Sequence, residues 1–547
     1  MIHLPMAERL SPLVPLENGT FRNIWIANLA SSFGALIQGV GAAWLMTSIA
    51  DSVDMVALVQ ASTSLPIMMF SLLGGAIADS FNRRQVMLAA QCFMLAVSIL
   101  LMAGALLGLI SPWLLLAFTF LLGCGTALNN PSWQASVGDM VPREQLPAAV
   151  TLNSIGFNIS RSVGPAIGGI IVAVAGAAGA FALNALSYLG LLYVLIRWKP
   201  PAETSRLPRE GIGPAMLSGV RYVAMSPNLL RILLRGSIFG FTAISVMALL
   251  PVVSASQLTG GPLTYGLMLG SFGLGAVGGA LLSGRLHMRF SSEAVVRIAF
   301  VSFAIAAFIT GVSPSVWITS PALMLGGASW VLALSLFNVS VQLSSPRWVV
   351  GRALSLYQTA TFGGMALGSW IWGLMAESYG LAIAFGAASL LMLAGALLGL
   401  RIPLPPRTMI DLDPLNRWQE PHLETELQPR SGPILIQISY KIRPENLTAF
   451  MAVMDARKRI RRRDGARHWT LLRDLGQPNL WTESYQTPTW TEYVRHNLRM
   501  TKADAEIGEK VRALHEGPEP PAVQRFVERP TNWFEVTGTP KSPIDHI

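Results

Sequence analysis

Twelve apolar segments, each about as long as a helix that crosses a lipid bilayer, fill most of the chain up to residue 402. They lie near residues 22–47, 54–78, 86–108, 112–134, 149–174, 179–198, 229–256, 263–286, 294–313, 317–342, 351–376 and 381–401. Each is close to the ~20 residues that a helix needs to cross the hydrocarbon. With 52% hydrophobic and only 13% charged residues, the chain is too apolar for a single soluble core. We therefore expect an all-α membrane protein with twelve transmembrane helices.

Basic residues occur at only one set of the connections between these segments. The connections near 48–53, 109–111, 175–178, 257–262, 314–316 and 377–380 contain none. At the opposite ends lie Arg83, Arg84, Arg143, Arg197, Lys199, Arg206, Arg209, Arg221, Arg285, Arg289, Arg347, Arg352 and Arg401. Because positive loops stay on the cytoplasmic side, both termini are expected in the cytoplasm. Most of the net charge of +10 belongs to these loops, so no nucleic-acid partner is expected.

A short charged hinge separates the second and third apolar segments. It reads Gly75-Ala-Ile-Ala-Asp79-Ser-Phe-Asn82-Arg83-Arg84, in which Asp79 can hold an ion pair or cap the following helix. Gly75, Asp79, Arg83 and Arg84 match the G-x-x-x-D-x-x-G-R-R/K signature of the major facilitator superfamily, and Asn82 replaces the second glycine. Asparagine tolerates a left-handed backbone almost as glycine does. The chain therefore resembles that superfamily; the alternative is an ordinary basic cytoplasmic loop.

The first half of the membrane region recurs weakly 204 residues later. One offset aligns Gly75 with Gly279, Pro142 with Pro346, Gly164 with Gly368 and Gly169 with Gly373. Opposite Asp79 and Arg84 the copy carries Ser283 and Met288, so the halves are expected to share a shape but not a role. Two homologous six-helix halves with a substrate site between them are the expected build of a facilitator.

Composition divides the chain into six regions. They are an N-terminal six-helix half at 1–200, a central cytoplasmic loop at 201–228, a C-terminal six-helix half at 229–402, a linker at 403–432, a cytoplasmic domain at 433–536 and a flexible tail at 537–547. The linker is polar and contains several prolines.

The cytoplasmic domain alternates strand and helix patterns. Strands are predicted at 434–440, 468–474, 480–486 and 523–528, and helices at 445–463 and 490–515. The order β-α-β-β-α-β is the ferredoxin-like pattern. It is similar to the dimeric α+β barrel of the antibiotic-biosynthesis monooxygenase group, which implies a possible homodimer through this domain. An enzymatic domain and a purely dimerising or regulatory domain both remain open.

Three stretches resemble the transmembrane secretion effector group, which includes the enterobactin exporter. They are Asn130-Pro-Ser-Trp-Gln134, Val141-Pro-Arg-Glu-Gln-Leu146 and the run from Asn158 to Gly169. The resemblance spans nearly the whole chain and implies a multi-pass exporter in a bacterial inner membrane.

The fifth apolar segment carries closely spaced small residues. Gly164, Gly168 and Gly169 permit close helix contact, and Pro165 bends the span. This is similar to the glycine-proline signature of exporters, and the four residues are predicted to shape the motion of the two halves. The alternative is tight helix packing alone.

Arg161 lies well inside the same segment and cannot be assigned to a loop. A buried arginine costs at least ~2.5 kcal/mol in a membrane, so it should face a cavity or a partner. It is a candidate anion-binding group for a carboxylate or catecholate; the alternative is a structural tie. The predicted substrate pathway comprises Asn28, Gln38, Asn130, Gln134, Asn158, Arg161, Asn338 and Gln358. Interhelical hydrogen bonding explains each of the amides equally well. Arg231 and Arg235 are expected to be interfacial anchors.

Neither a cofactor nor a metal is expected. The histidines of the cytoplasmic domain fit no metal spacing, and the chain carries no ATP-binding G-x-x-x-x-G-K-[ST] loop. No acidic residue lies deep in a predicted span, so a proton-carrying residue is not assigned. The expected function is a secondary transporter that exports a small amphipathic molecule, such as a siderophore, drug or secondary metabolite, by alternating access driven by the proton gradient.

Overall fold

A computed structural model describes residues 13–142, 145–199, 211–346, 348–405 and 427–529, and scattered positions between 412 and 425. The chain forms two compact units. The first contains Met1–Met216, Asn228–Val341 and Leu354–Arg407, and the second contains Leu217–Pro227, Gln342–Ala353 and Thr408–Ile547.

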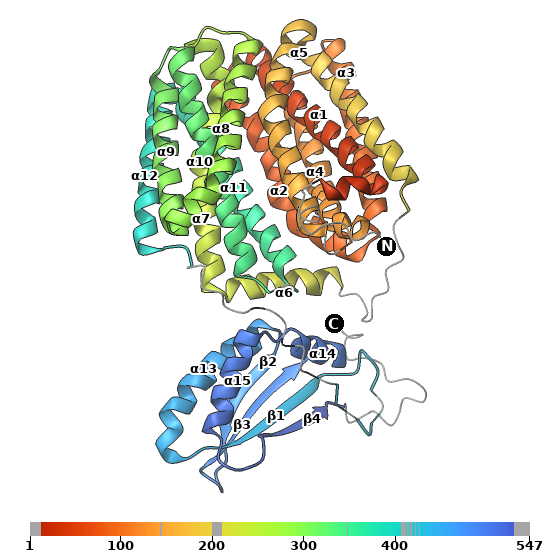
Figure 1. Cartoon of the computed structure of the whole chain (residues 1–547), viewed down its shortest axis with the longest axis vertical. Helices are drawn as coiled ribbons and strands as arrows, with labels where there is room; N and C mark the ends of the chain where they lie inside the picture. Colours follow the sequence, from red (N-terminus) through yellow and green to blue (C-terminus); the bar gives the residue numbers. More distant parts are fainter. Residues whose placement is uncertain are drawn as a thin grey trace. The chain divides into compact units, whose positions relative to one another are not determined.

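The first unit is a bundle of long helices (Figure 1). They are α1 (Gly19–Ile49), α2 (Val53–Ser80), α3 (Arg83–Leu106), α4 (Pro112–Met140), α5 (Leu146–Arg197), the start of α6 (Ile212–Ala224), α7 (Pro227–Val252), α8 (Pro262–Arg289), α9 (Ser292–Val312), α10 (Val316–Leu343), α11 (Val350–Tyr379) and α12 (Leu381–Arg401). A π-helical turn, Val253–Gln257, extends α7. Within the described residues, ten helices are long and apolar enough to cross a membrane.

Helix starts follow local side-chain chemistry. The Asn18 side chain accepts hydrogen bonds from the backbone of Thr20 and Phe21 and so caps α1. Ser111 and Ser291 cap α4 and α9 in the same manner. Such caps satisfy backbone N–H groups that have no partner inside the helix.

Each predicted apolar segment corresponds to a helix, but the segments at 149–174 and 179–198 are joined in α5. Gly176, with a φ of 67°, breaks the helical conformation between them. Glycine suits this position because its missing Cβ permits a positive φ. The predicted segment at 351–376 corresponds to α11, which is not among the ten candidate spans. Twelve transmembrane helices therefore remain a prediction.

Helix packing repeats at the predicted offset. A Cβ at Gly123 of α4 would lie 3.1 Å from the Thr63 carbonyl oxygen of α2, and Gly327 of α10 meets the backbone of Phe272 in α8 in the same way. Gly164 of α5 packs on Leu36 of α1, and Gly368 of α11 packs on the backbone of α7. The first and second halves of the bundle thus use small residues at matched positions for close helix contact.

The second unit contains a four-stranded sheet (Figure 1). Its strands are β1 (Ile434–Lys441), β2 (Arg467–Arg473), β3 (Leu480–Thr487) and β4 (Ala522–Val527), in the order β2-β3-β1-β4 with all pairs antiparallel. Helix α13 (Leu447–Arg463) connects β1 to β2, and α14 (Trp490–Leu498) and α15 (Lys502–Leu514) connect β3 to β4. The predicted β-α-β-β-α-β order is present, with the second helix divided in two.

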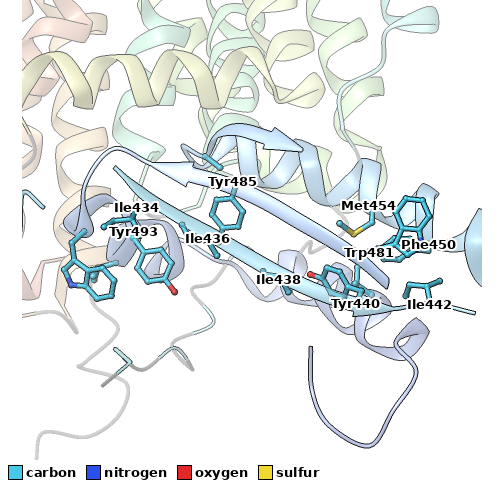
Figure 2. Close-up of a cluster of buried hydrophobic side chains, with 14 residues drawn as sticks. Ile434, Ile436, Ile438, Tyr440, Ile442, Phe450, Met454, Trp481, Tyr485 and Tyr493 are labelled. Atoms are coloured by element: carbon cyan, nitrogen blue, oxygen red, sulfur yellow. The ribbon is translucent and has the colours of Figure 1, made fainter. Parts of the chain in front are cut away.

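The core of this unit lies on one face of the sheet. Figure 2 shows Ile434, Ile436 and Ile438 of β1 beside aromatic residues of the neighbouring elements. Every second residue of β1 is buried, because successive side chains of a strand point to opposite faces.

Candidate functional site

The two halves of the bundle touch closely near the connection between α1 and α2. This end of the bundle is called the α1–α2 end, and the opposite end is called the α2–α3 end. A Cβ placed on Gly169 of α5 would lie 2.8 Å from the Cα of Gly266 in α8. A Cβ placed on Gly266 would in turn lie 2.9 Å from the Pro165 carbonyl oxygen. Trp44 of α1 stacks on Tyr265 of α8, with ring centres 6.3 Å apart.

The other glycines of the α5 motif face a different neighbour. Gly164 approaches Leu36 and Gly168 approaches Ile37, both in α1. Gly169 therefore contacts the second half of the bundle, whereas Gly164 and Gly168 hold α5 against α1. The motif residues thus pack on both sides of α5; their role in the motion of the halves remains a prediction.

Arg161 reaches from the first half to aromatic side chains of the second. Its guanidinium carbon lies 5.0 Å from the ring centre of Trp330 in α10 and 5.7 Å from that of Phe272 in α8. A cation over an aromatic face is attracted by the ring quadrupole, most strongly over tryptophan. The Trp330 side chain is buried, and its indole N–H has no acceptor among the residues that the structure describes. A guanidinium of the first half thus lies beside an indole of the second half whose N–H has no acceptor among the described residues.

Helices α2 and α11 also join the halves at two places. At the α1–α2 end, the Glu377 carboxylate accepts a hydrogen bond of 2.6 Å from the Val53 backbone N–H. Farther along, the Ser71 hydroxyl lies 2.9 Å from the Thr359 hydroxyl and 3.2 Å from the Ser355 carbonyl oxygen. Gly75 belongs to this contact, because a Cβ there would meet the Ser355 hydroxyl at 3.0 Å.

The predicted loop motif begins α3. Arg83 donates to both oxygens of Asp139 in α4, at 2.9 and 3.0 Å, and to the Ala135 carbonyl. Arg84 donates to the carbonyls at 195 and 196, which end α5, at 2.8 and 2.7 Å. Asn82 is the N-cap of α3, and its φ is −66°. It therefore caps the helix and does not adopt the left-handed backbone conformation expected of a residue that replaces glycine. The Asp79 side chain lies outside the described residues.

The predicted pathway amides differ in their surroundings. Gln38 is buried and accepts hydrogen bonds from Ser98 of α3 and Asn184 of α5. Tyr188 also accepts from Asn184. This network lies inside the first half, which favours the interhelical interpretation for Gln38. Asn130 and Gln134 are exposed, Asn28, Asn338 and Gln358 are half-buried, and the Asn158 side chain lies outside the described residues.

One ion pair of the second half was not foreseen in the sequence. Arg235 of α7, expected at the interface, is 1% exposed and donates to both oxygens of Glu293 in α9, at 2.9 and 2.8 Å. Arg235 also donates to the Ile402 carbonyl, and Glu293 accepts from the Leu404 N–H. The pair therefore ties α7 and α9 to the end of α12. Its one sequence signal is that Arg235 lies two turns inside its helix, away from the start.

The second unit has its own buried polar cluster, formed by Glu483, Arg457, Arg461, Trp469, Tyr440 and His496. Glu483 accepts hydrogen bonds from Arg457 at 2.8 Å, Arg461 at 3.3 Å, Trp469 at 3.0 Å and Tyr440 at 2.9 Å. Burial alone would raise the pKa of Glu483, but the charges of Arg461 and Arg457 lower it to about 2. The carboxylate is saturated by its neighbours, which is typical of a structural network. Within the described residues, no group of histidine, cysteine and acidic side chains is suited to a metal ion.

Comparison with known proteins identifies relatives along most of the chain. A family model described as transmembrane secretion effector matches residues 10–531. The enterobactin exporter EntS of Salmonella typhimurium is 27% identical over 359 residues, covering 64% of this chain and 84% of that protein. The macrolide efflux protein A of Streptococcus pyogenes is 23% identical over 303 residues, covering 54% of this chain and 73% of that protein.

Solved structures of membrane transporters share the fold. A bacterial homologue of the human lysosomal transporter Spinster, inward-facing and unoccupied, has a TM-score of 0.53 at 15% identity and covers 70% of this chain and 94% of its own. The POT family transporter PepTSo has a TM-score of 0.57 at 12% identity and covers 70% and 97%.

Proposed function

This chain belongs to the transmembrane secretion effector family of major facilitator transporters, and from that premise we propose that it exports a small amphipathic organic molecule. The siderophore, drug and secondary-metabolite classes fit the proposal, because the related proteins are an enterobactin exporter and a macrolide efflux protein. The chain is a multi-pass membrane transporter, and its relatives and structural neighbours are transporters and not enzymes. They give the alternative of an enzyme fusion no support.

The observation that carries the proposal is the position of Arg161. Its guanidinium lies over the Trp330 ring, the Trp330 indole N–H lacks an acceptor among the described residues, and the two side chains come from opposite halves. A substrate with an anionic or acceptor-rich aromatic group would satisfy both donors and lie against the ring of Phe272. Since the two halves move apart in alternating access, such a substrate would be released when the site divides.

Several finer features belong to the same proposal. The chain crosses the membrane twelve times with both termini in the cytoplasm, so the α1–α2 end is external. Proton exchange drives export. The C-terminal domain is ferredoxin-like, which the antiparallel order β2-β3-β1-β4 supports, and it forms a homodimer. The conformational residues are Gly75, Asp79, Arg83, Arg84, Gly164, Pro165, Gly168 and Gly169.

The test is uptake into inside-out membrane vesicles under an imposed proton gradient. An anionic catechol siderophore and a cationic dye are compared in wild type, in Arg161→Ala and in the control Arg231→Ala, which removes an exposed arginine of α7. We expect siderophore uptake that Arg161→Ala abolishes and Arg231→Ala preserves. Dye uptake that is unaffected by Arg161→Ala would instead assign Arg161 a structural role and contradict the proposed site.

A further inference from the structure

The two halves of the bundle are held differently at the α2–α3 end. In the first half, the Arg83–Asp139 ion pair joins the start of α3 to the end of α4. Arg84 joins the start of α3 to the carbonyls that end α5. Two connections thus fix this end of the first half.

The second half cannot form the same contacts. At the offset of 204 residues, Arg83 and Asp139 correspond to His287 and Leu343, and Arg84 corresponds to Met288. Glu293 and Arg235 take over one connection, because they join the start of α9 to the chain after α12. The other connection, at the end of α10, has lost its carboxylate because position 343 is leucine.

The chain at that position belongs to the second unit. The segment Gln342–Ala353 contains the end of α10 and the start of α11, and Leu217–Pro227 leads directly into α7. Both segments belong to the same compact unit as the C-terminal sheet. The end of α10 and the starts of α7 and α11 therefore belong to this unit.

Aromatic side chains of these segments meet arginines of the C-terminal domain. The Arg499 guanidinium carbon lies 4.3 Å from the ring centre of Trp348, and that of Arg463 lies 5.0 Å from Tyr222. Tyr222 and Trp348 pack edge to face, with ring centres 5.4 Å apart. Arg352 at the start of α11 donates to the Ser218 hydroxyl of α6 at 2.7 Å.

The two arginines are held in position by their own domain. Arg463 pairs with Asp464 and with Asp504, both at 2.8 Å. Arg499 lies 3.9 Å from Glu492, and 8% of its side chain is exposed. Fixed arginines lose little side-chain freedom when an aromatic ring packs on them, which strengthens a cation–π contact.

We propose that the C-terminal domain is an intramolecular clamp on the second half of the transporter. The domain binds Trp348 of the α10–α11 connection and Tyr222 near the end of α6. These contacts take the place of the Arg83–Asp139 ion pair, which has no counterpart at positions 287 and 343 of the second half. Arg463 and Arg499 of the domain thus bind the aromatic side chains of two segments of the same chain, Leu217–Pro227 and Gln342–Ala353. The inference rests on the repeat and on contacts within the second unit, and it does not depend on the identity of the substrate.

Hydrogen exchange of the full-length protein tests the clamp without any substrate. Arg499→Ala is compared with Arg459→Ala, which removes an exposed arginine of the same domain, and Trp348→Ala with Trp317→Ala, an exposed tryptophan of α10. Loss of a partly buried cation–π contact should speed exchange at 342–353 by about three- to tenfold in Arg499→Ala and Trp348→Ala. Peptides from β1 and β3 should be unchanged, which shows that the domain remains folded.

Two results would overturn the proposal. Unchanged exchange at 342–353 in Arg499→Ala would show that the domain does not hold this connection. Equal acceleration in β3 would show that Arg499→Ala unfolds the domain. Arg499→Gln then decides, because it keeps a long polar side chain but removes the cation. Unchanged exchange at 342–353 in Arg499→Gln would also overturn the clamp.

Discussion

The Arg161 guanidinium carbon lies 5.0 Å from the centre of the Trp330 ring, so a cation of the first half ends on an aromatic side chain of the second. In the proposed alternating-access mechanism, this contact lies between the two halves that separate during transport. Two properties of Arg161 contribute to the contact, its positive charge and its planar shape.

Arg161→Lys and Arg161→Gln distinguish these two properties. Lysine keeps the charge but cannot stack or bind in bidentate fashion. We expect Arg161→Lys to retain preference for the anionic substrate with an affinity reduced about tenfold, which corresponds to ~1.4 kcal/mol. Arg161→Gln should lose that preference. Concentration dependence of uptake in inside-out vesicles measures both, and equal behaviour of the two variants would contradict a role for the charge.

Gly169→Ala should hinder closure of the α1–α2 end. A methyl group there would meet the Gly266 backbone, which cannot yield as a side chain does. Overpacking of about 1–3 kcal/mol would shift the balance toward separated halves by about 5- to 140-fold. Gly190→Ala is the matched control, because a Cβ at that position of α5 meets nothing within 4 Å. Transport rates of the purified variants in liposomes measure the effect, and equal rates would contradict it.

Gly399→Ala should destabilise the second half of the bundle. The added methyl group would lie 2.8 Å from two Arg235 nitrogens and even closer to a Glu293 oxygen. Disturbing a buried ion pair leaves an uncompensated charge, which costs about 3–5 kcal/mol when a partner is lost. Gly386→Ala in the same helix is the control, since the space around Gly386 is open. Thermal unfolding in detergent should show a lower Tm for Gly399→Ala only.

The C-terminal domain should lose stability in acid. Burial and the neighbouring Arg461 charge lower the pKa of His496 from its usual 6.5 to about 3, so the imidazole stays neutral in the folded domain. Its Nε2 lies 2.9 Å from an Arg461 nitrogen and must act as acceptor, which a protonated ring cannot do. The unfolded chain takes up a proton below pH 6.5 that the folded domain refuses, so stability falls from pH 6.5 towards pH 3.

Glu483 extends the effect to lower pH. Its pKa is about 2 in the folded domain against an ordinary 4.5, so its stabilising contribution is present above pH 4.5 and is lost as the pH falls towards 2. The hydrogen-exchange rate of β3 in the full-length protein, corrected for the intrinsic rate, should rise as the pH is lowered from about 7.5 to about 5.5. His496→Asn should reduce this rise, whereas the exposed His468→Asn should not.

Periodic patterns predicted most elements of the second unit. The predicted strands at 434–440 and 480–486 match β1 and β3 to within one residue, because alternation in a half-buried strand is a direct consequence of its geometry. The predicted helix at 490–515 is instead α14 and α15, since Thr501 forms a capping box with Asp504 and starts a new helix. That local signal is present in the sequence but is weaker than the apolar period around it.

Side-chain partners could not be predicted in the same way. Composition places Gln38 in a span but does not show that Ser98 and Asn184 surround its amide. Arg235 has the sequence context of an interfacial arginine, and only the three-dimensional contact of α7 with α9 shows that Glu293 binds it. Such pairs depend on which helices are neighbours, and an apolar span carries little information about its neighbours.

The contact between Gly169 and Gly266 has a consequence for how such a transporter changes over evolutionary time. The two backbones meet there without side chains, so if closure occurs at this contact, the contact would carry no information about the molecule being moved. With the substrate site proposed at Arg161, residues there could change to suit a new cargo without altering the contact between Gly169 and Gly266. The same helix contacts could in this manner be kept in related transporters with different substrates, so that substrate specificity evolves without a change in fold.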